Sequence, residues 1–175
     1  SNGLICANSE TGTLLAPQPS CIEPIMSDDV ICLNEMTNSW NNHELNAVQV
    51  YGGHLVSIHD DDMNEIVKLL SIRDSWIGLN DVDEENSFVW SDGSPYDFQA
   101  WAPDQPNQII TESSKENCVQ VGGQGNPAWN DQRCQLNDRH AIYRIPSSSI
   151  CKAIETGMSC VDVRGIPAAP QDPCR

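Results

Sequence analysis

Five oxygen-bearing side chains lie within a short stretch of this 175-residue chain: Gln105, Asn107, Glu116, Asn130 and Asp131. Ca²⁺ binds roughly 6–8 oxygen atoms, drawn from carboxylates, amide carbonyls, backbone carbonyls and water. The five residues offer carboxylates and amides, and none of them carries a sulfur or an imidazole. Their types and spacing therefore predict a calcium site within the segment 101–134.

A helix is expected over residues 39–51, well before this segment. Ser39 or Asn38 can cap its beginning, and the pair Gly52-Gly53 ends it. The apolar stripe expected on this helix consists of Leu45, Val48 and Ala47.

A second helix and three strands complete the predicted frame. Residues 63–72 place apolar side chains at helical spacing, and we interpret the three aspartates at 60–62 as their cap rather than as a metal site. Residues 54–58 are expected to form a strand directly after the first helix. The uninterrupted apolar run at 76–79 is typical of a buried strand, and 88–90 alternates as a further strand.

The composition excludes several classes of partner. With 25 acidic and 9 basic residues, the formal net charge is −16. Nucleic acids and anionic membranes are bound through basic surfaces, so we expect neither as a partner. The acidic surface serves solubility or attracts cations. No apolar run approaches the roughly 18 residues of a membrane span, so we expect no membrane insertion. The first residues lack signal-peptide features, as expected of a processed or recombinant chain.

Eight cysteines, an even number without a Cys-x-x-Cys pair, predict disulfides and therefore a secreted, extracellular protein. A zinc site is the competing interpretation, and it would need closely spaced Cys and His ligands. The four histidines show no such spacing: His43, His54, His59 and His140.

Four motifs in the right order resemble the carbohydrate-recognition domain of C-type lectins. They are Gln105-Pro106-Asn107, the acidic Glu116 two residues before a cysteine, Trp129-Asn130-Asp131, and the WIGL run at 76–79. The resemblance covers about residues 21–146. It implies an α+β C-type lectin-like fold, with two helices flanking small antiparallel sheets and a long calcium-binding loop region. Residues 1–20 would then form an N-terminal arm, and 147–175 a Cys- and Pro-rich C-terminal tail packed on the domain.

The resemblance also implies disulfides. The long form of the family has an N-terminal hairpin that would pair Cys21 with Cys32, and a bridge in the site that would join Cys118 to Cys134. A further family bridge is absent here, because Val48 or Ala47 and a residue near Tyr143 occupy its two positions, and we expect an apolar pair instead. The pairing of the remaining cysteines stays open: Cys6, Cys151, Cys160 and Cys174.

By the same resemblance, the five oxygen-bearing residues would hold one Ca²⁺, and two neighbouring sugar hydroxyls would complete its coordination. Sugar would contact Gln105, Asn107, Glu116 and Asn130. We expect a cis bond at Pro106, because it directs the two flanking side chains to one side. An accessory calcium site, expected to be weak or empty, would use Asp81, Glu85, Gln108, Glu116 and Asn117.

The tripeptide Gln-Pro-Asn is mixed in character. Relatives with Glu-Pro-Asn generally favour mannose-type sugars, and those with Gln-Pro-Asp favour galactose-type sugars. Only Glu116 and Asp131 are charged in the set, so calcium affinity should be reduced. The residues after Asn107 supply no tryptophan for galactose to stack on, which favours mannose-, glucose- or fucose-type glycans.

The expected function is that of a calcium-dependent lectin of host defence or cell-surface recognition, in which oligomer formation would add avidity. The alternative is a domain of the same fold with a weak calcium site that binds a protein, ice or mineral surface. An enzyme is not expected, because no motif combines a nucleophile with a base.

Overall fold

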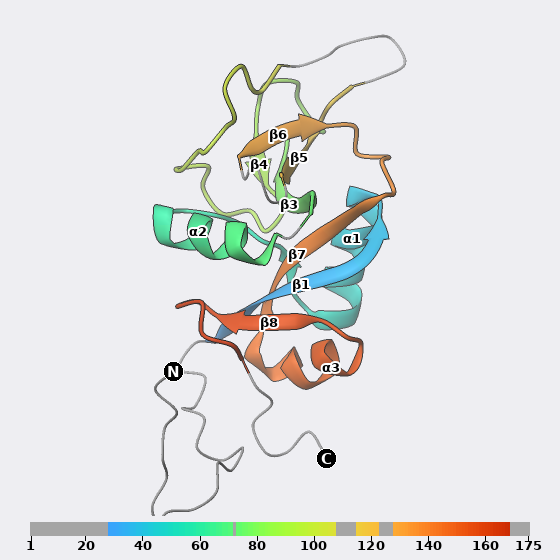
Figure 1. Cartoon of the computed structure of the whole chain (residues 1–175). Helices are drawn as coiled ribbons and strands as arrows, with labels where there is room; N and C mark the ends of the chain where they lie inside the picture. Colours follow the sequence, from blue (N-terminus) through green and yellow to red (C-terminus); the bar gives the residue numbers. More distant parts are fainter. Residues whose placement is uncertain (1–27, 72, 108–114, 123–127, 169–175) are drawn as a thin grey trace, which may run out of the picture.

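The computed structural model describes residues 28–71, 73–107, 115–122 and 128–168 (Figure 1). Several predictions concern residues outside these ranges, namely the N-terminal arm, Gln108, Cys6, Cys21 and Cys174. The fold is α+β, as expected. Its strands are β1 (Asp29–Asn38), β2 (His54–Leu55), β3 (Ser75–Asn80), β4 (Val89–Trp90), β5 (Cys118–Val121), β6 (Trp129–Gln132), β7 (Arg139–Pro146) and β8 (Ser159–Asp162). Its helices are α1 (Trp40–Asn46) with a π-helical continuation η2 (Ala47–Tyr51), α2 (Asp61–Leu70), a 3-10 turn η3 (Ser147–Ser149) and α3 (Ile150–Glu155).

The strands form one continuous sheet in the order β6-β5-β3-β7-β1-β8, with β2 paired to β7 and β4 to β3. The expectation of small antiparallel sheets therefore needs a correction, because β3 runs parallel to β7 and joins the two halves. All six residues of β3 are buried, which confirms the buried strand. The strands expected at 54–58 and 88–90 are shorter than predicted, and each retains two paired residues.

The first helix begins and ends as predicted, but its buried face is different. The Ser39 side chain accepts a hydrogen bond from the Asn42 N–H, and Gly52 ends the helix with φ +71°. Leu45 and Val48 are exposed, so the predicted stripe is wrong at these two positions, whereas Ala47 is buried as expected. The buried side chains instead are Trp40, His43, Ala47 and Tyr51. This face also follows helical spacing, and the sequence could not distinguish it because it includes a histidine.

The second helix confirms the interpretation of the triple aspartate as a cap. The Asp60 carboxylate accepts a hydrogen bond from the Met63 N–H at 2.8 Å, and Asp61 and Asp62 are exposed in the first turn. Asn64, buried on the inner face of α2, accepts a hydrogen bond from the Trp129 indole at 3.1 Å. The helix is thereby fixed to the strand that carries two of the proposed calcium ligands.

Two hydrophobic clusters contain alternating residues of the same strands and so lie on opposite faces of the sheet. Val30 and Tyr143 belong to the cluster that contains α1, η2 and α3 side chains. Ile31 and Ile142 belong to the cluster that contains α2 side chains and Trp129. This alternation is the ordinary consequence of a strand having two faces.

The predicted Cys21–Cys32 disulfide is wrong, because Cys32 is bonded to Cys160. The two residues face each other in the antiparallel register of β1 and β8. Spacing along the chain suggested a local partner, whereas the true partner arrives through a strand 128 residues away. Cys151 is also disulfide-bonded, and the described residues contain no free cysteine.

The segment that follows β7 is built into the fold. Its helix α3 buries Ile150 and Ala153, and β8 adds to the edge of the sheet beside β1 (Figure 1). The site strands β5 and β6 lie at the opposite end of the molecule (Figure 1). Within the described residues, no helix has the length and apolar character needed to cross a bilayer.

A polar cluster stands where the family bridge is missing. Ala47 and Tyr143 are both fully buried in the same hydrophobic cluster, as expected for a replacement pair. The Tyr143 hydroxyl also lies within hydrogen-bonding distance of His43 Nδ1 (2.8 Å), Asn34 Nδ2 (3.1 Å) and Asn46 Nδ2 (3.2 Å). Burial lowers the pKa of His43 to about 4. The histidine is therefore neutral in the native protein at neutral pH.

Candidate calcium and carbohydrate site

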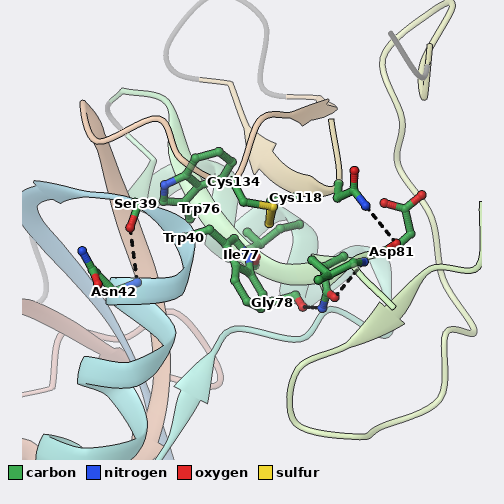
Figure 2. Close-up of a disulfide and its surroundings, with 12 residues drawn as sticks. Ser39, Trp40, Asn42, Trp76, Ile77, Gly78, Asp81, Cys118 and Cys134 are labelled. Carbon is green, nitrogen blue, oxygen red and sulfur yellow. Dashed lines mark hydrogen bonds between the residues drawn. A yellow bond between two sulfur atoms is a disulfide. The ribbon is translucent and has the colours of Figure 1, made fainter. Parts of the chain in front are cut away.

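Strands β5 and β6 position three of the five proposed ligands. They pair antiparallel, with Gln120 opposite Asn130 and Val119 opposite Asp131, and Glu116 lies just before β5. The Cys118–Cys134 disulfide, predicted from the resemblance, is present and ties the start of β5 to the residues after β6. It packs beside Trp40 and Trp76, and the Trp40 N–H donates to the Cys134 carbonyl at 3.0 Å (Figure 2).

Trp129 anchors the site to the core. Its side chain is fully buried, so it is a core residue rather than a platform for sugar. The rings of Trp90, Phe98 and Trp101 pack edge-on against it at centroid distances of 5.6 to 5.9 Å. Its backbone N–H donates to the Ala100 carbonyl at 3.0 Å, and its carbonyl accepts from the Ala102 N–H at 2.9 Å. The chain that leads to Gln105 is therefore held alongside β6.

The Gln105-Pro106 bond is cis, as predicted. The Gln105 N–H donates to the Ala102 carbonyl at 3.0 Å. The Asn107 N–H lies 3.1 Å from Gln105 Oε1 and 3.2 Å from Asp131 Oδ1, so both oxygens accept from it. The shared Asn107 N–H therefore places the side-chain oxygens of Gln105 and Asp131 next to each other.

Glu116 precedes β5 by two residues and Asn130 lies in β6, so the paired strands place both of them. Asp131 is fully buried and Glu116 is 8% exposed. Asn130 Oδ1 is buried and accepts no hydrogen bond within the described residues. A buried acceptor in this state calls for a donor or a cation, so the residues fit a bound Ca²⁺.

The proposed ligand set contains few charges. Among the described residues, no cluster of three or more His, Cys, Asp or Glu side chains is arranged to hold a metal ion. Three of the five proposed ligands are amides. Calcium binding here would therefore depend on amide oxygens as well as on two carboxylates.

The accessory residues also gather, around Asp81 and Asn117. The Asp81 N–H donates to the Asn117 carbonyl at 3.1 Å, and Asn117 Nδ2 donates to the Asp81 carbonyl at 3.2 Å. Asn80, the residue before Asp81, faces Cys118 in the register of β3 and β5, which places Asp81 beside the strand that carries the disulfide. Both Glu85 carboxylate oxygens are buried and make no hydrogen bond within the described residues, and the Lys115 ammonium lies 3.7 Å from Glu85 Oε2. As at Asn130, buried oxygens in this state call for a donor or a cation, and the lysine would compete with a cation for them. The weak accessory site therefore stays a prediction.

A surface groove that the sequence did not predict lies beside Gln105. It has a volume of about 590 Å³, and aromatic and amide side chains line it. The only sequence signal was the aromatic content of residues 96–101, which does not by itself distinguish core from surface.

The Lectin C-type domain family model matches residues 36–142, and the chain belongs to this family. The low affinity immunoglobulin epsilon Fc receptor of Mus musculus is 42% identical over 84 residues, which is 47% of this chain and 24% of the receptor. The chain therefore spans about a quarter of that relative's length.

Two solved structures extend the comparison. The carbohydrate-recognition domain of cow CD23, crystallised in the presence of a GlcNAc2Man3 oligosaccharide, has a TM-score of 0.60 and 30% identity over 70% of this chain and 91% of that one. A calcium-independent type II antifreeze protein has a TM-score of 0.62 and 25% identity over 70% of this chain and 90% of that one. Domains of this family are binding modules rather than enzymes; they generally bind Ca²⁺ and glycans, although some members are calcium-independent.

Proposed function

We propose that this chain is an extracellular, calcium-dependent carbohydrate-binding module. Its Ca²⁺ is held by Gln105, Asn107, Glu116, Asn130 and Asp131. The observation that carries the proposal is the Asn107 N–H shared between Gln105 Oε1 and Asp131 Oδ1, which unites two segments 24 residues apart. The buried, unsatisfied Asn130 Oδ1 supports a cation at the same place.

The side chains of the set would bind sugar hydroxyls in a complementary way. When bound, Ca²⁺ supplies open coordination positions for two neighbouring hydroxyl oxygens. Glu116 accepts a hydrogen bond from one hydroxyl, and the Asn130 amide donates to the same group. Gln105 and Asn107 both present NH₂ donors to the other hydroxyl. Binding is reversible, and no covalent bond changes.

Mannose-, glucose- or fucose-type glycans are the favoured ligands, ahead of galactose-type glycans. No tryptophan follows the tripeptide to stack on galactose. The similarity to a domain crystallised with a mannose-containing oligosaccharide supports the same direction. The disulfides support an extracellular location, because such bonds persist in oxidising compartments.

Asp131→Asn tests the calcium site directly. The substitution keeps the shape of a fully buried side chain and removes one of two carboxylates, so calcium affinity should fall by about tenfold or more. Asp104→Asn is the matched control, since it makes the same change at an exposed position with φ +64°, which asparagine tolerates. Titration calorimetry measures both. Equal calcium affinity in the two variants would remove Asp131 from the ligand set.

A second candidate function is binding to ice, protein or mineral surfaces without calcium. The similarity to a calcium-independent antifreeze protein and the low charge of the ligand set favour it. Thermal hysteresis in the presence of a chelator is the direct test of ice binding. Hysteresis together with an absence of calcium binding would replace the lectin proposal.

A further inference from the structure

The groove beside Gln105 is a surface feature that the proposed function leaves unused. Three segments that are separate in the sequence line it: the loop before β4, residues 96–101, and the Gln105-Pro106 dipeptide. Asn86 and Gln99 are exposed and Tyr96 is 37% exposed, so the groove is accessible from solvent.

One wall of the groove is aromatic and rigidly supported. The Phe88 ring lies edge-on to Trp101 at a centroid distance of 5.0 Å, and the Trp101 indole N–H donates to the Tyr96 hydroxyl at 2.9 Å. Trp101 in turn packs on the buried Trp129. These contacts hold the three rings in place before any ligand arrives, which lowers the entropic cost of binding against them.

The remainder of the lining is polar and uncharged. Amide groups of Asn86, Gln99 and Gln105 stand around the rings, and none of the described residues that line the groove is charged. A surface of aromatic faces and amides suits a ligand with apolar C–H faces and neutral hydroxyls, which is the chemistry of a sugar ring. A lipid chain would leave the amides without partners, and an ionic ligand would find no counter-charge.

Gln105 connects the groove to the proposed calcium site. Its side chain accepts a hydrogen bond from the Asn107 N–H within the proposed calcium site and also lines the groove. A glycan whose terminal residue occupies the calcium site therefore meets the groove with its next residue. We propose that the groove is a second subsite that binds the penultimate sugar of the same glycan, so that the ligand is at least a disaccharide.

This inference rests on the proposed lectin function. One series of calorimetric titrations tests the groove subsite and the lectin function separately. Methyl mannoside and mannobioses of different linkage are titrated into the calcium-loaded protein. At least one mannobiose should bind about three- to tenfold more tightly than methyl mannoside, the range expected of an added aromatic contact. If methyl mannoside binds and no mannobiose binds more tightly, the subsite is refuted while the calcium site stands. If neither sugar binds, both proposals fail.

Tyr96→Ala and Gln99→Ala locate the effect. Each should reduce the ratio of mannobiose to methyl mannoside affinity toward one. Val89→Ala is the control, because Val89 is 46% exposed on the neighbouring β4 and does not line the groove. It should keep the wild-type ratio. Unchanged ratios in both Tyr96→Ala and Gln99→Ala would overturn the proposal.

Octyl mannoside separates a sugar subsite from an apolar one. The proposal predicts that octyl mannoside binds no more tightly than methyl mannoside. A gain for the octyl glycoside without a gain for any mannobiose would show that the groove binds alkyl chains, and the sugar subsite would be wrong.

Discussion

At the scale of single residues, Gln105 limits the proposed calcium site. It contributes an amide oxygen where a carboxylate would add a third negative charge to Glu116 and Asp131. Gln105→Glu should therefore raise calcium affinity by about tenfold, since ligand charge count is one of the terms that tune affinity. Calcium titration by calorimetry measures the change. The same variant should strengthen binding of mannose-type sugars, because it creates a Glu-Pro-Asn tripeptide.

A general effect of added negative charge must be separated from ligation. Gln135→Glu makes the same substitution at an exposed position after Cys134, outside the ligand set. It should leave calcium affinity within about twofold of the wild type, because exposed charges are screened. Equal gains in both variants would mean that Gln105 does not ligate the ion.

His43 makes the stability of the fold depend on pH. Burial lowers its pKa from 6.5 to about 4, so the unfolded chain takes up a proton before the native protein does. Stability is therefore full above the unfolded pKa and declines as the pH falls from 6.5 toward 4. At about 1.4 kcal/mol per unit of pKa difference, the loss amounts to roughly 3 kcal/mol.

Urea denaturation between pH 7 and pH 5 measures this decline. His43→Gln should flatten the pH dependence in that window, whereas His59→Gln, which alters a partly exposed histidine paired with Asp97, should leave it in place. An NMR titration of the wild type that finds His43 protonated near pH 6.5 would contradict the explanation independently of any variant.

At the scale of elements, the two described disulfides have different roles. Cys32–Cys160 closes a loop with a separation of 128 residues and joins β1 to β8, the strand at the other end of the sheet order from β6 (Figure 1). Removing it by a Cys32→Ala/Cys160→Ala double substitution should cost about 4–5 kcal/mol of unfolding free energy in the chain-entropy picture and leave calcium affinity unchanged.

Cys118–Cys134 spans only 16 residues and should contribute about 3 kcal/mol by the same reasoning. Cys118 lies two residues after Glu116, and Cys134 lies three residues after Asp131, so the bridge ties together the two segments that hold the proposed ligands. A Cys118→Ala/Cys134→Ala protein should therefore lose calcium affinity even under conditions where it remains folded. Urea denaturation and calcium titration on both double variants check this contrast. Calcium binding that depends on Cys32–Cys160 instead would refute the assignment of roles.

Local signals explain which elements could be predicted from the sequence. The caps Ser39 and Asp60 and the stop at Gly52 involve neighbours in the chain, and the structure confirms all three. Strand β8 forms by pairing with β1, which lies more than a hundred residues earlier in the chain. No local signal marks such a pairing, so the segment was predicted to be part of a tail. The partner of Cys32 was missed for the same reason.

In the candidate site too, features set by local motifs could be predicted, and features set by distant residues could not. The cis bond before Pro106 and the bridge at Cys118 follow from motifs, and both are present. The groove was not predictable, because Phe88, Tyr96 and Trp101 become neighbours only after the loops around Trp129 have folded. The buried face of α1 was also missed, since His43 is buried there as a neutral residue.

At the scale of the whole molecule, a single site of low charge implies modest affinity for one sugar. Clustering several copies would multiply binding to a cell surface by roughly 10²–10⁴. The net charge of −16 opposes close packing of copies and favours solubility. Immobilised glycans at high density reproduce the multivalent situation and so suit the decisive experiment.

The central claim is calcium-dependent recognition of sugar, and a glycan array run in millimolar calcium and again with a chelator tests it most directly. We expect binding to mannose-, glucose- or fucose-type glycans that disappears in chelator. Binding that persists in chelator, or no binding in either condition by protein whose folding is verified, would contradict calcium-dependent sugar recognition and favour surface binding without calcium.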